Sequence, residues 1–276
     1  MSVAAIPSLP APETLRTAWV SIPVAAAVGV APTTIRAWWS RPASGPLRGA
    51  VLVLPEVFGV NGWVRSVADR LAAQGYGALA ITPFARTAPE LDLGYDDAGL
   101  AIGREHRDQV QASSFLADAQ AAVHWLQQVL QVEGLADQPL GCVGFCFGGH
   151  LASLAATLPA IGATCSFYGA RISTFRPGGG PPTLEVLPEI PGRLWCFVGD
   201  ADPLMPEEEV AAIRAAMERA NGGRSPDQPE ARHRFWCAPQ AGHGYLCEAR
   251  TDFHPVQAAI AWTAMLQLLE EQLGGF

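Results

Sequence analysis

The stretch GCVGFCFGGH, residues 141–150, places Cys146 at the junction of a predicted strand and a predicted helix. A sharp strand-to-helix turn lifts its central side chain above the edge of a sheet, and it needs small residues two positions before and two positions after that side chain. Gly144 and Gly148 occupy these two positions. The helix dipole and the free N–H groups at a helix start also favour the thiolate form of a cysteine. The pattern therefore makes Cys146 a candidate nucleophile.

Other roles for Cys146 must be weighed against this one. A zinc site built on Cys142 and Cys146 is disfavoured, because no second pair of Cys or His residues follows at ligand spacing. A disulfide is disfavoured because the N-terminal segment lacks the basic region of a secretion signal, and thiols in the cytoplasm are kept reduced. Cys142 lies within the predicted strand and is expected in the core. A glycine-rich turn around a buried cysteine remains the alternative to a nucleophile.

An acid and a base follow Cys146 in the order that a nucleophile–acid–histidine triad requires. The predicted strand RLWCFVG is followed by Asp200 and Asp202, and the last predicted strand, RHRFWCAP, is followed by His243 in a glycine-flanked loop. His150 comes soon after the glycine-rich turn and is expected to take part in helix packing. The sequence therefore indicates a Cys–His–Asp site, with two candidates for the acid.

Alternating strands and helices are predicted to position these side chains. Continuous apolar runs such as RGAVLVLPEVFG are typical of strands buried on both faces, and residues 114–131 have the spacing of an amphipathic helix. Residues 18–24 and 34–40 predict an antiparallel edge, whereas the segment 88–107 is polar and predicts an irregular surface excursion. We expect one α/β domain over residues 1–276, with a doubly wound, mostly parallel sheet and an antiparallel N-terminal edge.

The composition excludes several classes of function. Of the 276 residues, 49% are hydrophobic and 16% charged, which suits a protein with a large buried core. The net charge of −8 argues against nucleic acid or an anionic membrane as the main partner. All 18 basic residues are arginines, which excludes Schiff-base chemistry and a phosphate-binding lysine. No signal peptide or membrane-spanning run is predicted, so we expect a cytoplasmic protein, a monomer or small homo-oligomer, that binds a small molecule.

Several motifs together resemble the dienelactone hydrolase (carboxymethylenebutenolidase) family. They are LPEVFGVNGW, VGFCFGG, FYG, GDAD and AGHGY, and the similarity extends from about residue 18 to the C-terminal helix. The resemblance implies an α/β-hydrolase fold that hydrolyses ester or lactone bonds through a thioester on cysteine, without a cofactor or metal. Dienelactone or a related carboxylate-bearing compound would be the substrate. The alternatives are a thiol-dependent carboxylesterase for neutral esters and a non-catalytic ligand-binding member of the fold.

The resemblance also assigns catalytic roles to individual residues. Cys146 matches the family nucleophile and His243 the base. Asp202 matches the acid, with Asp200 as the second candidate. Glu56 matches a glutamate beside the nucleophile that helps to control its ionisation, and a nearby carboxylate does oppose thiolate formation by like-charge repulsion.

Substrate-binding roles follow from the same resemblance. The backbone N–H groups of Val57 and Phe147 would form the oxyanion hole. Arg86, in PFAR, matches an arginine that binds the substrate carboxylate, and Tyr168, in FYG, matches a tyrosine near the site.

One position departs from the family pattern. The family has a second carboxylate-binding arginine four residues after the histidine, and this sequence has Cys247 there. Arg250 follows three residues later and is a candidate to enter the pocket. The departure leaves the hydrolytic chemistry in place but weakens the case for dienelactone itself as the substrate.

Overall fold

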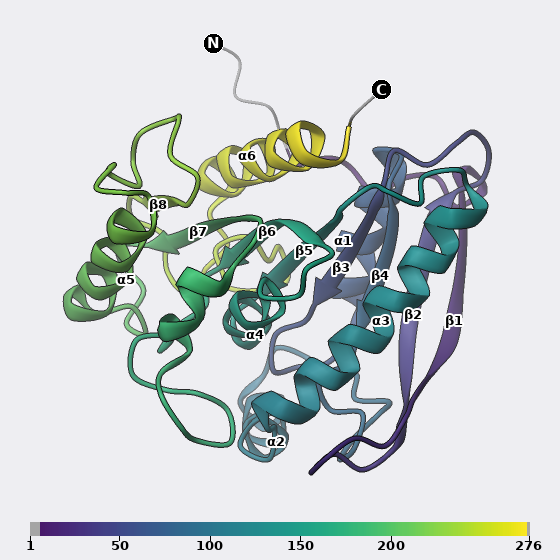
Figure 1. Cartoon of the computed structure of the whole chain (residues 1–276), viewed down its shortest axis with the longest axis horizontal. Coiled ribbons are helices and arrows are strands. Elements are labelled where there is room, and N and C mark those ends of the chain that lie inside the picture. The colour runs from purple at the N-terminus through teal and green to yellow at the C-terminus, as the bar shows by residue number, and fades with distance from the viewer. Residues whose placement is uncertain (1–5, 275–276) are drawn as a thin grey trace.

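A single eight-stranded sheet is the frame of the molecule (Figure 1). The computed structural model describes residues 6–274. Along the sheet the strand order is β1-β2-β4-β3-β5-β6-β7-β8. Strand β2 pairs antiparallel with both β1 and β4, and all other pairs are parallel. The strands are β1 (Leu15–Val24), β2 (Thr33–Pro42), β3 (Ala50–Leu54), β4 (Gly77–Ile81), β5 (Leu140–Phe145), β6 (Ile161–Phe167), β7 (Arg193–Gly199) and β8 (Arg234–Ala238).

Helices cover both faces of this sheet, which explains the continuous apolar runs in its central strands. Strand β3 is buried along its whole length. Its Val51 and Val53 pack in one core cluster with helices α1 (Gly62–Ala73) and α6 (Pro255–Leu273). Its Leu52 and Leu54 pack in a second cluster with α3 (Ala112–Val132) and α4 (Phe147–Ala155). The predicted doubly wound, mostly parallel sheet is therefore confirmed.

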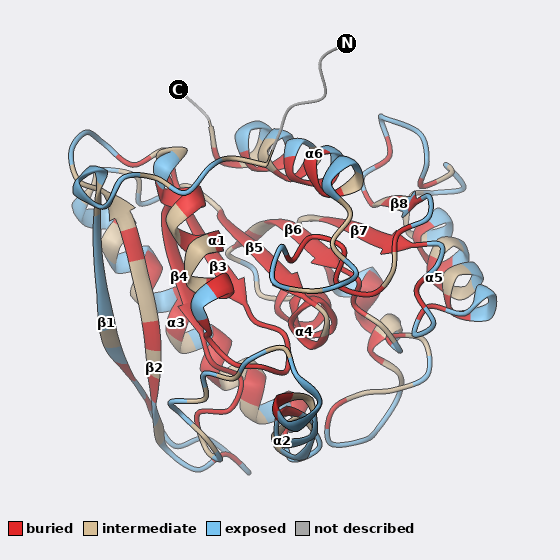
Figure 2. Cartoon of the chain, turned by 180° about the vertical axis from the view of Figure 1, so that it is seen from behind, coloured by how far each residue is buried: buried red, intermediate tan, exposed pale blue. Residues whose placement is uncertain are grey.

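The antiparallel edge of the sheet is more exposed than its centre (Figure 2). Strand β1 at the antiparallel edge is mostly exposed, while the central strands are buried. At the other end, helix α5 (Glu207–Ala220) and the 3-10 helix η2 (Thr183–Glu189) build a third, smaller core cluster over β7 and β8. A short 3-10 helix, η1 (Pro12–Thr14), precedes β1. Within residues 6–274, none of the helices has both the length and the apolar character needed to cross a membrane.

The segment 88–107 is the place where the sequence-based prediction of irregular structure is wrong, because it contains helix α2 (Asp97–Arg107). Asp96 caps this helix by accepting a hydrogen bond from the backbone N–H of Gly99. The helix is polar overall, and its buried residues are Gly99 and Gly103, so no buried apolar side chain marks it in the sequence. A Cβ on Gly99 would lie 2.4 Å from the carbonyl oxygen of Gly94.

The turn between β5 and α4 is tightly packed. Cys146 has φ 53° and ψ −116°, a backbone conformation that is strained for a residue with a side chain. A Cβ on Gly144 would lie 2.0 Å from the carbonyl oxygen of Gly148, and a Cβ on Gly148 would lie 2.3 Å from the carbonyl oxygen of Leu54. The two glycines therefore let α4 start directly against the ends of β3 and β5.

Gly148→Ala should destabilise the protein strongly. The added methyl group meets backbone atoms of β3, which cannot move aside as a flexible side chain can. We expect a loss of about 3 kcal/mol or more in the free energy of unfolding, measured by urea denaturation. The matched control is Gly62→Ala, at the start of α1, where the nearest atom to an added Cβ is the end of the Arg65 side chain at 3.8 Å. Equal effects of the two substitutions would contradict this account of the turn.

Candidate active site

The residues assigned to the site follow the carboxyl ends of five strands. Because the five strands are parallel, their carboxyl ends meet at one edge of the sheet. The side chains that follow β3, β5, β6, β7 and β8 at this edge are Glu56, Cys146, Tyr168, Asp202 and His243.

A chain of hydrogen-bond distances connects three of these side chains. The Sγ atom of Cys146 lies 3.0 Å from Nε2 of His243, and Nδ1 of His243 lies 2.8 Å from Oδ2 of Asp202. A carboxylate only accepts hydrogen bonds, so Nδ1 carries a hydrogen and Nε2 faces the sulfur. The other oxygen of Asp202 accepts a hydrogen bond from the backbone N–H of Leu204 at 2.8 Å. Asp200 instead accepts one from the backbone N–H of Gln240 at 2.6 Å.

The surroundings of His243 favour its protonated form. Burial alone lowers the pKa of His243, but the Cys146 sulfur and the Asp202 carboxylate outweigh burial and raise this pKa to about 10. The ring of Tyr168 packs edge-on against the imidazole, with 5.2 Å between ring centroids. An imidazolium held next to a sulfur favours the thiolate, which is the nucleophilic form of cysteine.

Tyr168 is fully buried in a strained turn after β6. Its φ is 41°, and burial together with Glu56 raises the pKa of its phenol well above the usual range. Its hydroxyl has no hydrogen-bond partner among the described residues. Tyr168 is therefore an uncharged side chain that packs against His243.

Glu56 forms a buried ion pair with Arg250. Its carboxylate is completely buried, and its Oε1 lies 2.9 Å from Nη1 of Arg250. Burial lowers the pKa of Arg250, but Glu56, Tyr168 and Cys146 together outweigh burial and raise this pKa. The thiol of Cys247 is buried as well, and burial and Glu56 raise its pKa to about 12. Arg250 thus supplies the positive charge near Glu56 that the sequence lacks at Cys247.

A cleft opens in front of Cys146, which we call the Cys146 cleft. It has two lobes, of about 320 and 280 Å³. One lobe is lined by Phe147, His150 and Phe175, and the other by Phe58, Leu100 and Arg250. Both lobes share the residues Val57, Arg104, Arg107, Cys146, Leu204 and His243.

The backbone next to the sulfur can hold an oxyanion. Phe147 is the first residue of α4, so its N–H has no acceptor within the helix. Val57 follows β3 and lines both lobes beside Cys146. Donors at a helix start and on a neighbouring loop are the arrangement that stabilises a tetrahedral intermediate.

Arg86 lies outside the Cys146 cleft. Its guanidinium pairs with the buried carboxylate of Asp118 and donates to the carbonyl oxygen of Ala31 at 3.2 Å. It lines a separate cavity of about 70 Å³. The structure therefore does not bring Arg86 together with Cys146, although the resemblance assigned it to the substrate.

Among the described residues, four arginines line the Cys146 cleft, and sequence reasoning named Arg250 but missed Arg104, Arg107 and Arg171. Arg104 and Arg107 belong to α2, which was predicted to be irregular, and a capping residue at Asp96 was the available signal. His150 is buried and lines one lobe, where its ring nitrogens bond to Ala170 O at 2.9 Å and Thr183 Oγ1 at 2.8 Å.

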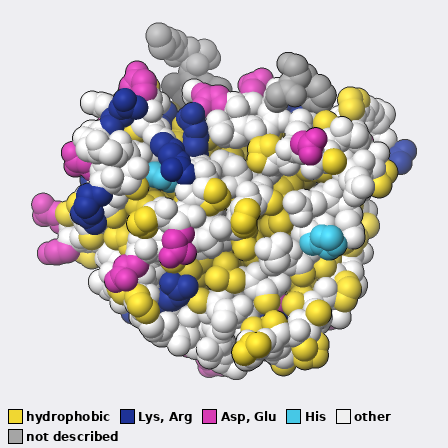
Figure 3. Space-filling view, in the orientation of Figure 1, with side chains coloured by type: hydrophobic (Ala, Val, Ile, Leu, Met, Phe, Trp, Pro, Cys, Tyr) yellow, Lys and Arg dark blue, Asp and Glu magenta, His cyan; other side chains and the backbone are white. Residues whose placement is uncertain are grey.

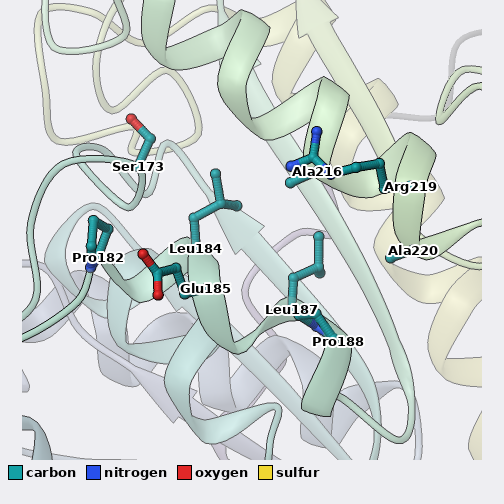
Figure 4. A pocket seen from close by; sticks show the side chains of 9 residues that line it. All are labelled: Ser173, Pro182, Leu184, Glu185, Leu187, Pro188, Ala216, Arg219 and Ala220. Carbon is teal, nitrogen blue, oxygen red and sulfur yellow. The ribbon is translucent and has the colours of Figure 1, made fainter.

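A larger cavity lies elsewhere on the molecule, between η2 and α5 (Figure 4). It measures about 500 Å³ and is lined mainly by apolar side chains such as Leu184 and Leu187, with Glu185 and Arg219 as its charged residues. No cysteine or histidine lines it. On the face drawn in Figure 3, acidic and basic side chains lie intermixed over α5. This cavity lacks a nucleophile and a base, so the Cys146 cleft is the candidate active site.

Comparisons with known proteins agree with this fold. Residues 35–273 match the dienelactone hydrolase family. A provisionally named carboxymethylenebutenolidase from Synechocystis sp. is 34% identical over 81% of this chain and 86% of its own length. A provisionally named 2-oxo-3-(5-oxofuran-2-ylidene)propanoate lactonase from Bradyrhizobium sp. is 30% identical over 96% of this chain and 98% of its own.

A solved structure has the same fold. It is a provisionally named dienelactone hydrolase from Klebsiella pneumoniae, with a TM-score of 0.77 and 24% identity over 93% of this chain and 99% of that chain. The sheet therefore belongs to the α/β-hydrolase fold. Since the family match covers most of the chain, this protein belongs to the dienelactone hydrolase family and is a hydrolase of ester or lactone bonds.

Proposed function

We propose that this hydrolase forms a thioester on Cys146 and acts on small esters or lactones that carry a carboxylate. The observation that carries the proposal is the contact chain from Cys146 through His243 to Asp202, with distances of 3.0 and 2.8 Å, whose first two members line the Cys146 cleft. It joins a nucleophile to a base, and the base to a carboxylate that orients it.

The reaction follows from this geometry. The Cys146 thiolate attacks the carbonyl carbon, and the resulting oxyanion accepts hydrogen bonds from the N–H groups of Val57 and Phe147. The intermediate collapses with cleavage of the C–O bond, and His243 gives its proton to the leaving oxygen. His243 then takes a proton from water, the hydroxide attacks the thioester, and the acid and the thiolate are released. In a lactone the leaving oxygen stays attached to the acyl group.

The relatives and the cleft both support a carboxylate-bearing substrate. The Bradyrhizobium relative is named for a furanone lactone with a propanoate group. In this chain, arginines line a cleft that is otherwise largely apolar. The second candidate is a thiol-dependent carboxylesterase for neutral esters, which the apolar lining also suits. Comparing matched esters with and without a carboxylate separates the two functions.

Glu56 and Arg250 act on the ionisation of Cys146 in this proposal. The carboxylate of Glu56 opposes the thiolate, whereas the guanidinium of Arg250 offsets that carboxylate at 2.9 Å. The balance between these two charges sets the reactivity of the thiol in the resting enzyme.

Replacing the sulfur tests the nucleophile. Cys146→Ala should lower kcat for nitrophenyl esters and lactones by at least about 10³-fold, because no other group can form the covalent intermediate. The control is Cys237→Ala, since Cys237 is exposed on β8 and lies outside the cleft. Thermal melts of both variants show whether the fold is intact. Activity retained in a folded Cys146→Ala protein would contradict the assignment of Cys146 as the nucleophile.

The identity of the acid is decided by a pair of variants. Asp202→Asn should lower kcat by more than about 10-fold but less than the roughly 10⁴-fold known for serine triads, because a thiolate forms more easily than an alkoxide. Asp200→Asn should leave kcat close to wild type, because Asp200 bonds to the backbone of Gln240. A larger loss at Asp200 in steady-state assays would reverse the assignment.

The effect of Glu56 on the sulfur is measurable without substrate. Glu56→Gln should speed up the alkylation of Cys146 by iodoacetamide about tenfold, which corresponds to one unit in the pKa that governs the thiolate fraction. Arg250→Gln should act in the opposite direction. The peptide that contains Cys146 must be followed by mass spectrometry, because the exposed Cys237 also reacts. Equal rates in wild type and Glu56→Gln would remove Glu56 from the control of the thiol.

A further inference from the structure

Two arginines of α2 stand at the point where the two lobes of the Cys146 cleft meet. Arg104 and Arg107 line both lobes together with Cys146 and His243. They are three residues apart on one helix, so their side chains lie on the same face. A substrate bound at the sulfur therefore has these two guanidinium groups beside it, whichever lobe its acyl chain enters.

The packing of Gly103 fixes these arginines in place. A Cβ on Gly103 would lie 2.4 Å from the carbonyl oxygen of Val57, so α2 rests directly on the backbone that follows β3. Val57 also lines the Cys146 cleft. Since Arg104 is the next residue along the helix, its position relative to the sulfur is set by this contact.

Two other arginines near the site are already neutralised. Arg250 is paired with Glu56 at 2.9 Å and has Asp252 at 3.8 Å, and Arg86 is paired with Asp118. Neither is therefore available to an anion without breaking an existing ion pair.

The arginines of α2 are less fully paired with carboxylates. Within residues 6–274, Arg104 has no carboxylate within ion-pair distance. Arg107 pairs with its neighbour Asp108, whose side chain is 61% exposed, and such a solvated pair is weak. The lobe that contains Phe175 is lined by no acidic residue. Arg171 lines this lobe as well and has no ion pair among the described residues, but its guanidinium lies over the Phe175 ring at 4.8 Å, and it does not line the second lobe. Arg104 and Arg107 are therefore the weakly compensated arginines that line both lobes beside the sulfur.

We propose that Arg104 and Arg107 form the subsite that binds the substrate's anionic group, so that α2 selects acyl compounds with an apolar body and a carboxylate. This inference rests on the proposed function of the Cys146 cleft. The carboxylate is held on the α2 side of the sulfur, while Arg86 keeps its pair with Asp118. The apolar body contacts side chains that line the lobes, such as Leu100 and Leu204.

The test compares two nitrophenyl esters that share a leaving group, nitrophenyl hemiglutarate with a free carboxylate and the neutral nitrophenyl valerate. Arg104→Gln and Arg107→Gln should each raise KM for the anionic ester about tenfold, the loss expected for one hydrogen bond to a charged group. The double variant should raise it further. KM for the neutral ester and kcat for both should stay near wild type, and Arg104→Lys should recover part of the affinity.

Two control variants separate a local role from a general effect of charge. Arg16→Gln removes an exposed arginine of β1 and should leave both esters unaffected. Arg86→Gln should do the same. A selective loss for the anionic ester in Arg86→Gln, or equal changes for both esters in the α2 variants, overturns the proposal.

A binding measurement tests the anion subsite independently of turnover. Calorimetric titration of the Cys146→Ala protein with nitrophenyl hemiglutarate should give a Kd that rises at least tenfold when Arg104→Gln and Arg107→Gln are added. If wild type hydrolyses neither ester but binding still depends on these arginines, the proposed function fails and the subsite stands. If the hemiglutarate ester is hydrolysed and binding is unchanged in the variants, the subsite fails and the proposed function stands.

Discussion

The close approach of α4 to the ends of β3 and β5 is the constraint on which the site depends. Gly144 and Gly148 have no side chains to separate these backbones, and Cys146 takes a φ of 53° as a result. This strained turn brings three parts of the site together: the sulfur, the first N–H groups of α4 and the loop after β3. Any change that moves α4 away displaces the thiol and the oxyanion donors together.

Charges around the sulfur are compensated in pairs, and this explains how a buried carboxylate is tolerated there. Glu56 is fully buried, and an isolated ionised carboxylate in that position is costly. Arg250 supplies the opposite charge from a loop after β8, in place of the residue at Cys247. Arg250 is committed to Glu56, so an anionic substrate needs positive charge from elsewhere in the cleft.

The sequence predicts the sheet and the reactive residues for a shared reason: each has a signal in the order of residues along the chain. Apolar runs reveal β3 and β5, and glycine spacing reveals the turn at Cys146. Side-chain pairing across long distances has no such signal. Arg86 matches a family motif, yet its partner Asp118 is 32 residues away, and Arg250 meets Glu56 across 194 residues. The sequence did not predict helix α2, because the residues that it buries are glycines and leave no apolar pattern.

Helix α2 links recognition of the substrate to the chemistry at the carbonyl group. Gly103 packs on the carbonyl oxygen of Val57, and the N–H of the same residue is a proposed oxyanion donor. The next residue, Arg104, faces the cleft. One short stretch of helix thus supports both the donor for the oxyanion and the charge for the substrate's anion. Because both are fixed to the same backbone, the distance between the two negative groups of a substrate is constrained, and this favours compounds whose carboxylate lies at a fixed distance from the scissile carbonyl.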